Sequence, residues 1–414
     1  MKTLIKNYSK IDIFIVLACL ASSGFPSFLS FQPFLFLLLP ICLYLIKVRK
    51  IQFQKSVITT ILVITVFAVL HFILGHRNLI GTIDLILRFS TIIVASVLVG
   101  TSFRPIFIYL MKFFSYVSVI IWCLIFIFPS FANILFSIGS ALPQFVSETW
   151  LQNTTTPGVS LYLYYLPEKL SSSYMSFFRN CGPFFEPGLF ASYLSLAIAL
   201  NMGVYNSLFN KDNIILLLAL LSTCSSAGYI SLLIILISSL FFSKSIFYRV
   251  VIILTLVLCW NPIMNLDFMS EKISTNFESA DSSASSRFGA VLYHLEKLSV
   301  SPLIGYAGGD MPLTRFDSLV GNYDASGLLS PNGVSFPFLF WGVPLGIVFF
   351  ALLFRSIQIL LPQTLPKYKL LLLFIILLSA SFSQTITTNP LILLMTAVSL
   401  TSYNKISLNE SRNN

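Results

Sequence analysis

Charged side chains are scarce in this sequence: Asp, Glu, Lys and Arg together make up 10% of its 414 residues. By contrast, 56% of the residues are hydrophobic, and Phe alone occurs 40 times. This composition excludes an ordinary soluble domain, and repeated apolar runs of about 15–25 residues predict transmembrane helices. We therefore expect an all-α polytopic integral membrane protein in which residues 1–414 form a single membrane domain.

Motifs for nucleotide-driven or metal-dependent chemistry are also missing. The sequence has no phosphate-binding P-loop, no dinucleotide-binding glycine fingerprint and no Asp-rich metal pair. Its three His and six Cys show no zinc-ligand spacing, and only Cys181 falls in a long polar segment. We therefore expect no metal, no cofactor and no disulfide framework. No internal repeat is found, which disfavours an inverted-repeat transporter.

The expected topology follows from about twelve apolar runs, each long enough to be a candidate span. The short segments between them are basic, as at Lys47–Lys50, and most Lys and Arg fall on the side that holds the N-terminus. The positive-inside rule makes this side cytoplasmic and explains the net charge of +10 without nucleic acid as a partner. Two long periplasmic loops, 136–187 and 265–333, then carry most of the acidic residues. The expected spans are 11–23, 28–46, 56–74, 82–100, 106–135, 188–206, 213–224, 227–243, 247–264, 334–354, 370–382 and 390–403.

The stretch from Arg179 to Gly188 places two opposite charges next to an apolar helix. Pro187 fits the first turn of that helix, whose N-terminus presents free N–H groups and a positive dipole end. Together with Arg179, this helix end suits a phosphate or pyrophosphate, and Glu186 could act as a general base or orient an arginine. The alternative interpretation is a loop salt bridge combined with a helix cap.

The second long loop combines a cation with a histidine. Helical character over 287–298 would place Arg287 and His294 on one face, where they could bind a phosphate and relay a proton. The alternative is an amphipathic helix that lies on the outer leaflet of the membrane. His71 and His76, near the end of the third run, are expected at the membrane interface rather than in a catalytic role.

Two intramembrane features leave alternatives open. Asp84 and Arg88 are spaced to pair on one helix face, and they form either a self-satisfied pair or a cleft wall in which Arg88 meets a lipid-linked phosphate. Ser222–Ser231 interrupts an apolar run with small hydroxyl residues. This interruption indicates either a tight external turn or close helix packing.

Four stretches carry a likeness to a known family: Arg179–Leu194, Ser225–Ile237, Ser285–Gly309 and Pro331–Gly346. Together with the layout of about twelve helices and two long loops, they resemble the bacterial O-antigen polymerase and O-antigen ligase superfamily. The last stretch looks like the segment of that family that re-enters the membrane. The resemblance implies a metal-independent glycosyltransferase of the multi-helix membrane class, whose donors are glycans linked through pyrophosphate to undecaprenol.

Two departures from the ligase branch favour a polymerase. Asn332 matches an asparagine of that branch, but Pro331 stands where the branch carries a histidine. The turn at Ser225–Tyr229 also lacks the ligase's arginines. The expected function is therefore polymerisation of lipid-linked oligosaccharide repeat units of an O-antigen, a capsule or an exopolysaccharide. The alternatives are an O-antigen ligase that acts on lipid A core and a polysaccharide or lipid transporter.

The resemblance also implies where the chemistry takes place. The growing glycan would pass from undecaprenyl pyrophosphate to the next lipid-linked unit at the periplasmic face of the bacterial inner membrane, with both termini cytoplasmic. Expected partners are the undecaprenyl-pyrophosphate-linked oligosaccharides, the lipid bilayer, a chain-length regulator and a flippase. The expected site residues are Glu186, His294, Arg179 and Arg287 for catalysis, and Arg88, Arg315, Tyr306 and Asn332 for binding pyrophosphate and glycan.

Overall fold

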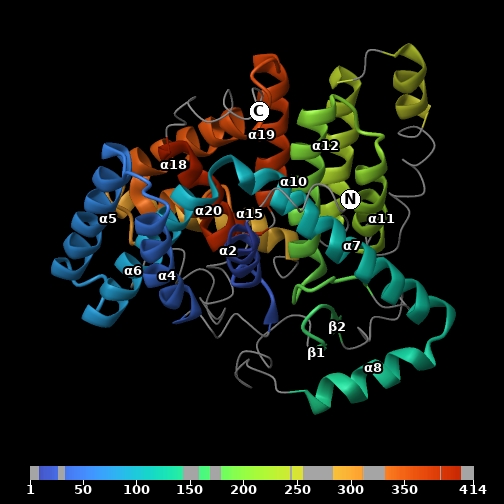
Figure 1. The fold of residues 1–414 in the computed structure, drawn as a ribbon, viewed down its shortest axis with the longest axis horizontal. Coiled ribbons are helices and arrows are strands. Elements are labelled where there is room, and N and C mark those ends of the chain that lie inside the picture. Colours follow the sequence, from blue (N-terminus) through green and yellow to red (C-terminus); the bar gives the residue numbers. More distant parts are fainter. Residues whose placement is uncertain are drawn as a thin grey trace.

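Helices make up most of the structure, a computed structural model that describes residues 9–26, 33–142, 158–167, 179–242, 245–254, 283–309, 311, 332–382 and 384–401. Figure 1 shows their arrangement. The α-helices are α2 (Lys10–Ala21), α4 (Pro33–Val48), α5 (Lys55–Ile73), α6 (Leu79–Val99), α7 (Phe103–Ile127), α8 (Ser130–Ala141), α10 (Pro187–Tyr205), α11 (Lys211–Ser222), α12 (Ser226–Phe242), α15 (Ser283–Val300), α18 (Phe336–Leu360), α19 (Lys367–Phe382) and α20 (Pro390–Ala397). The short 3-10 helices are η1 (Gly100–Ser102), η2 (Ile386–Thr388) and η3 (Val398–Leu400), and a further helical stretch covers 246–254.

Several of these helices have the length and apolarity of membrane spans. Within the described ranges, four helical segments are long and apolar enough to cross a bilayer: Lys55–Ile73, Leu79–Ile127, Pro187–Tyr205 and Phe336–Leu360. The second of them joins α6 to α7 through η1. Shorter apolar helices accompany them, among them α8, α12 and the stretch Pro390–Leu400. The structure is thus mainly helical and compatible with a membrane protein.

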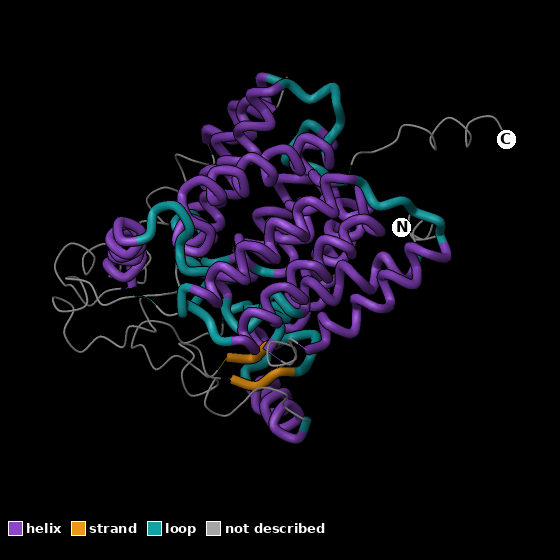
Figure 2. Tube along the Cα trace, turned by 90° about the vertical axis from the view of Figure 1, so that its left-hand side faces the viewer, coloured by secondary structure: helices purple, strands orange, loops and turns teal. Residues whose placement is uncertain are grey.

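The run expected to form one span over 106–135 is divided in the structure. α7 ends at Ile127, Pro129 follows, and α8 begins at Ser130, because a proline cannot continue the α7 hydrogen-bond pattern. The long loop expected over 136–187 therefore begins inside α8. It also contains a short antiparallel hairpin of β1 (Gly158–Ser160) and β2 (Tyr165–Pro167), beside which the described elements are helical, in keeping with the all-α expectation. Figure 2 shows this hairpin at one end of the helix bundle.

Among the four candidate spans of the described structure, the most deeply buried is α10, which lies between α7, α11, α12 and α19. Its sequence is apolar on all sides, as expected for a helix surrounded by other helices. Small residues let its neighbours approach closely. A Cβ built on Gly228 would lie 2.9 Å from the Ala191 Cβ, and one built on Gly203 would lie 2.7 Å from Leu361. Ser222–Ser231 therefore contributes both a turn and close packing, because α11 ends and α12 begins within it.

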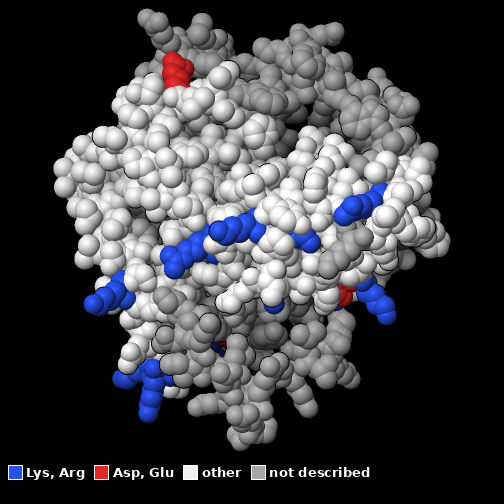
Figure 3. Space-filling view, turned by 90° about the horizontal axis from the view of Figure 1, so that it is seen from above, with Lys and Arg blue, Asp and Glu red and all other residues white. Residues whose placement is uncertain are grey.

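Segments that are distant in the sequence meet at each end of α10. At its N-terminal end, Phe185 N donates to Gly24 O at 3.2 Å. At its C-terminal end, Lys369 Nζ donates to Asn206 Oδ1 at 2.5 Å. We refer to the two ends of the helix bundle that contain these contacts as the α10 N-terminal end and the α10 C-terminal end. Seen from above, the molecule carries a row of Lys and Arg side chains across an otherwise almost uncharged face (Figure 3).

Candidate functional site

A buried amide holds the segment that leads into α10. Asn180 is fully buried, and its Nδ2 donates to Ser222 Oγ (2.7 Å) and to Ser118 Oγ (3.3 Å). Its Oδ1 accepts a hydrogen bond from Gly182 N at 2.9 Å, which forms the kind of side-chain turn that Asn favours. These bonds fix the backbone that directly follows Arg179 against α7 and α11.

Arg179 lies half-buried at the C-terminal end of α11. Its Nε donates to Thr223 O at 3.3 Å, where the cation also complements the negative end of the α11 dipole. The neighbouring Cys181 is fully buried, and this burial raises the pKa of its thiol although the Arg179 charge opposes the shift. A thiol with a raised pKa is a poor nucleophile at neutral pH, so Arg179 is the chemically relevant group here.

Glu186 occupies the N-cap position of α10, and its side chain makes no capping hydrogen bond. Among the described residues, Glu186 and Arg179 form no ion pair with each other, contrary to the loop salt-bridge interpretation. Near Gly188, two other polar side chains lie in the neighbourhood of the carboxylate. A Cβ built on Gly188 would lie 2.9 Å from Gln384 Nε2 and 3.5 Å from both Glu186 Oε1 and Ser225 Oγ. Because Gly188 has no side chain, the polar groups of Gln384, Glu186 and Ser225 can all lie close to it at the N-terminus of α10.

The turn before α18 continues this polar layer. Asn332 is fully buried, and its Oδ1 accepts hydrogen bonds from the backbone N–H groups two and three residues later (3.0 and 2.9 Å). Its Nδ2 has no hydrogen-bond partner within the described part of the chain. A side chain at Gly333 would overlap Gln384 O, so the turn packs directly against the segment that carries Gln384. His294 Nδ1 is 2.7 Å from Ser335 Oγ, and only 1% of His294 is exposed. His294 therefore stabilises the turn through Ser335 and is buried. Glu186, which is partly exposed, is the better candidate base.

A second charged cluster surrounds Arg88. Its Nη2 donates to Asp84 Oδ2 at 2.7 Å, and both side chains are about a quarter exposed (27% and 28%). Arg77 lies close enough to interact electrostatically with both charges, and its Nη1 donates to Ala307 O at 2.9 Å. Burial lowers the pKa of Arg77, although the guanidinium remains charged at any physiological pH. The Asp84–Arg88 ion pair is thus not isolated, since the charge of Arg77 interacts electrostatically with both of its members.

The two histidines near this cluster contact each other. His71 Nδ1 lies 2.9 Å from His76 Nδ1, and His71 Nε2 lies 3.1 Å from Ile304 O. A side chain at Gly309 would overlap His76 O, so the backbone of the 301–309 segment packs directly on the turn after α5. These histidines therefore join two segments, a role that differs from the isolated interfacial one expected from the sequence.

Other expected site residues take different places. Tyr306 is 1% exposed and its hydroxyl donates to Lys297 O at 2.8 Å, so its buried ring anchors the 301–309 segment to α15 and is not available to stack on a sugar. Arg287 lies on α15 as expected, but its side chain is outside the described part of the structure. Arg315 also lies outside the described residues. Within the described ranges, no three His, Cys, Asp or Glu side chains come together as metal ligands.

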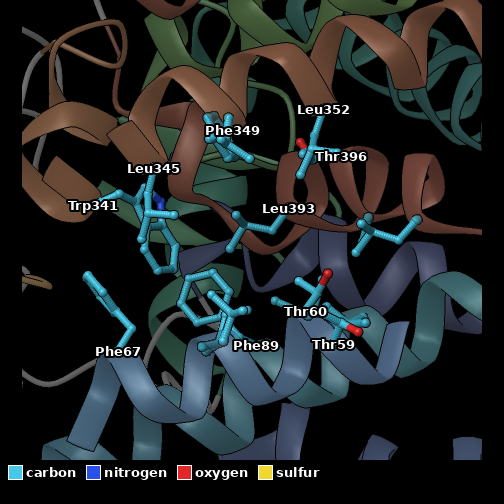
Figure 4. Close-up of a pocket in the computed structure, with 17 residues that line it drawn as sticks. Thr59, Thr60, Phe67, Phe89, Trp341, Leu345, Phe349, Leu352, Leu393 and Thr396 are labelled. Atoms are coloured by element: carbon cyan, nitrogen blue, oxygen red, sulfur yellow. The ribbon is translucent and has the colours of Figure 1, made fainter. Parts of the chain in front are cut away.

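An apolar cavity of about 320 Å³ lies between α5, α6, α18 and α20. Figure 4 shows Phe67 and Trp341 at one end of it and Thr59 and Thr60 at the other. Along α5 these ends are separated by about 12 Å, given a helical rise of about 1.5 Å per residue. Phe89 also lines the cavity and directly follows Arg88 in the sequence. The charged cluster around Arg88 and this cavity are therefore adjacent along α6.

The structure thus groups Glu186 with Ser225 and Gln384, and Arg88 with Arg77. Sequence reasoning did not single out Gln384 or Arg77. Each lies in a short polar segment beside an apolar run, and such a position is the signal that could have drawn attention to it. Comparison with known proteins finds no match to this chain among protein families, curated proteins or solved structures.

Proposed function

We propose that this protein polymerises lipid-linked oligosaccharide repeat units, as its resemblance to O-antigen polymerases implies. In this reaction an acceptor hydroxyl oxygen bonds to the anomeric carbon of the growing glycan. The bond from that carbon to the undecaprenyl pyrophosphate oxygen breaks, and the leaving pyrophosphate keeps the electron pair. The acceptor's proton passes to Glu186. The donor is already activated by its pyrophosphate, so the transfer itself consumes no nucleotide.

The observation that carries this proposal is the position of the Glu186 carboxylate and the interactions that it does not make. It caps no N–H group of α10 and does not pair with Arg179, yet it lies at a helix N-terminus beside Ser225 and Gln384. A carboxylate in this position can accept a proton from a bound hydroxyl. The neighbouring hydroxyl and amide can hold sugar hydroxyl groups by hydrogen bonds. Arg179 adds positive charge to the same segment for the anionic leaving group.

The donor lipid fits the second cluster. We place the isoprene units next to the phosphate end of the undecaprenyl chain in the apolar cavity between α5, α6 and α18, and the pyrophosphate beside Arg77 and Arg88. Arg77, Arg88 and Asp84 together carry a formal charge of +1, which favours a phosphate. Arg287 and Arg315 are additional candidate cations by resemblance. Asn332 is a candidate glycan ligand by resemblance alone, because its side chain is as buried as that of Tyr306.

The proposed orientation places the α10 N-terminal end in the periplasm and both chain termini in the cytoplasm of a bacterium with an inner membrane. Two observations support it. Turns expected outside meet one another, as Phe185 meets Gly24, whereas Lys369 meets Asn206 at the opposite end. The row of Lys and Arg on one face is also typical of a cytoplasmic surface.

Complementation of a deletion strain tests the function. Cells without the gene should carry only single repeat units on their surface glycan, and the wild-type gene should restore a ladder of longer chains. Glu186→Gln keeps the size of the side chain but removes the base, so we expect loss of the ladder at unchanged protein level. Lys55→Ala, an exposed change at the start of α5, serves as the control and should restore the ladder.

The same strain separates the alternatives. A ligase predicts long glycans that accumulate on undecaprenyl pyrophosphate and are missing from lipid A core. A transporter predicts repeat units that remain on the cytoplasmic side of the membrane. Either pattern would refute the polymerase proposal, and a normal ladder from Glu186→Gln would refute Glu186 as the base.

A further inference from the structure

A second cavity, with a volume of about 480 Å³, lies between α2, α7, α10 and α11. It is at the α10 C-terminal end, where Asn201 and Tyr205 of α10 contribute to its lining. The proposed active site lies at the other end of the same helix. This cavity therefore has no part in the proposed glycan transfer and needs its own explanation.

The lining of this cavity is predominantly basic. Arg104, Lys112 and Lys211 line it, and Asp212 is the only acidic residue in the lining. Lys112 forms an ion pair with Asp212, and Arg104 donates to Leu360 O, a neutral carbonyl. The Lys211 side chain is exposed. Arg104, Lys112, Lys211 and Asp212 together give this lining a formal charge of +2, which favours an anionic ligand.

Aromatic and apolar side chains complete the lining. Tyr116 and Tyr205 are exposed on the cavity rim (44% and 56%), and Ile13, Ile106 and Ile108 provide an apolar wall. Tyr side chains at the ends of membrane helices place their rings at the level of lipid headgroups. A cavity with basic residues, phenol hydroxyls and an apolar wall matches a molecule that has an anionic head and a hydrocarbon body.

We propose that this cavity binds an anionic phospholipid, with its phosphate held by Lys211 and Arg104 and its acyl chains against the isoleucine wall. Three features support a lipid over a soluble anion. The cavity is bordered by helices with the composition of membrane spans, it has an apolar wall, and its basic residues all lie in segments expected on the cytoplasmic side, where anionic lipids attract basic residues. Basic pockets between transmembrane helices on that side commonly hold lipid headgroups.

The test compares lipid retention by purified full-length variants. Wild type, Lys211→Ala and Lys55→Ala are offered equal amounts of phosphatidylglycerol and phosphatidylcholine in mild detergent, and native mass spectrometry counts the bound lipids. Lys55 is the matched control because, like Lys211, it is an exposed first residue of a helix, but it does not line the cavity. Equal unfolding temperatures in phosphatidylcholine show that the variants are folded.

We expect wild type and Lys55→Ala to retain phosphatidylglycerol preferentially. In Lys211→Ala the ratio of bound phosphatidylglycerol to bound phosphatidylcholine should be about fivefold lower, which is the effect of one basic residue near an anionic lipid. An unchanged preference in Lys211→Ala would overturn the proposal. Displacement of phosphatidylglycerol by millimolar inorganic phosphate would overturn the lipid assignment and leave a site for free phosphate. Neither outcome depends on polymerase activity, so failure here is distinct from failure of the proposed function.

Discussion

At the scale of single residues, the arrangement at the α10 N-terminal end depends on residue 188 being a glycine. Gly188 leaves room for Glu186, Ser225 and Gln384, which come from three separate segments. Any larger residue at this position would first meet Gln384 Nε2, at 2.9 Å from a Cβ. The amide is the flexible end of its side chain, so it can move aside without disturbing the backbone.

We therefore predict that Gly188→Ala lowers chain extension by about tenfold to hundredfold, the cost of a displaced positioning group, while changing stability little. Glycan ladders and thermal unfolding measure the two effects. The comparison variant is Gln384→Ala, which removes the displaced amide. If the alanine acts through Gln384, the double variant should be no less active than Gln384→Ala alone. Additive losses would show that Gly188 matters for another reason.

The buried thiol of Cys181 gives a prediction on pH. Burial raises the pKa of this thiol, so the folded protein keeps its proton at alkaline pH after the unfolded chain has lost it. Because the folded state then binds more protons, stability should fall as pH rises above the ordinary thiol pKa of about 8.5, by up to about 1.4 kcal/mol per pH unit. Denaturant unfolding of the purified protein from pH 7.5 to 10 measures the slope.

Cys181→Ala is the control for this slope. The variant should lose stability less steeply over the same pH range, because it carries no thiol at this position. Parallel slopes for wild type and variant would mean that Cys181 ionises equally in the folded and unfolded states.

At the scale of elements, α18 and the 301–309 segment interlock through glycines. Gly342 has φ of +77° inside α18, and a side chain there would overlap Leu303 O. Gly305 has φ of +61°, and a side chain there would overlap Leu339 O. Each glycine thus admits a carbonyl of the other segment. This contact brings Trp341 against Phe89 (ring centroids 5.0 Å apart) and forms one end of the apolar cavity.

Gly342→Ala should weaken the contact between α18 and the 301–309 segment and lower the free energy of unfolding. A positive φ costs a non-glycine residue about 1 kcal/mol, and the overlap with Leu303 O should add about 1–3 kcal/mol. Gly75→Ala is the matched control, because Gly75 has φ of +75° but no atom within 4 Å of a built Cβ. We expect unfolding measurements to show a clearly larger loss for Gly342→Ala. Equal losses would contradict the interlocking interpretation.

At the scale of the whole molecule, the two ends of the helix bundle differ in charge and in the proposed chemistry. The α10 N-terminal end gathers Glu186, Arg179 and the hairpin, whereas the α10 C-terminal end holds the basic cavity around Lys211. If the first end faces the periplasm, the hairpin residue Leu163, which is 48% exposed, lies outside the cell membrane, and Lys55 lies inside.

Single-cysteine variants test this orientation. In an otherwise cysteine-free protein, Leu163→Cys should react with a membrane-impermeant maleimide in cells with a permeabilised outer membrane. Lys55→Cys should react only after the inner membrane is broken. The reverse pattern would invert the topology and remove the periplasmic site.

The charged residues show how far sequence reasoning reaches. The Asp84–Arg88 pair was predictable because both residues lie on one helix, where a spacing of four fixes their proximity. The position of Arg77 beside this pair was not predictable, since it depends on how the turn after α5 packs on the segment around Ala307. The sequence likewise suggested Tyr306 as a sugar ligand, whereas the fold buries it against α15.

The sequence by itself determined that this protein is mainly helical and suited to a membrane, because apolar length and composition are local properties of the chain. It also placed Glu186 at the start of a helix, since Pro187 favours the first helical turn. Only the tertiary structure brought Gln384 to Glu186 and decided against the alternative interpretation of a loop salt bridge between Glu186 and Arg179. Contacts between residues so far apart in the chain are set by the packing of whole helices, and no local pattern encodes that packing.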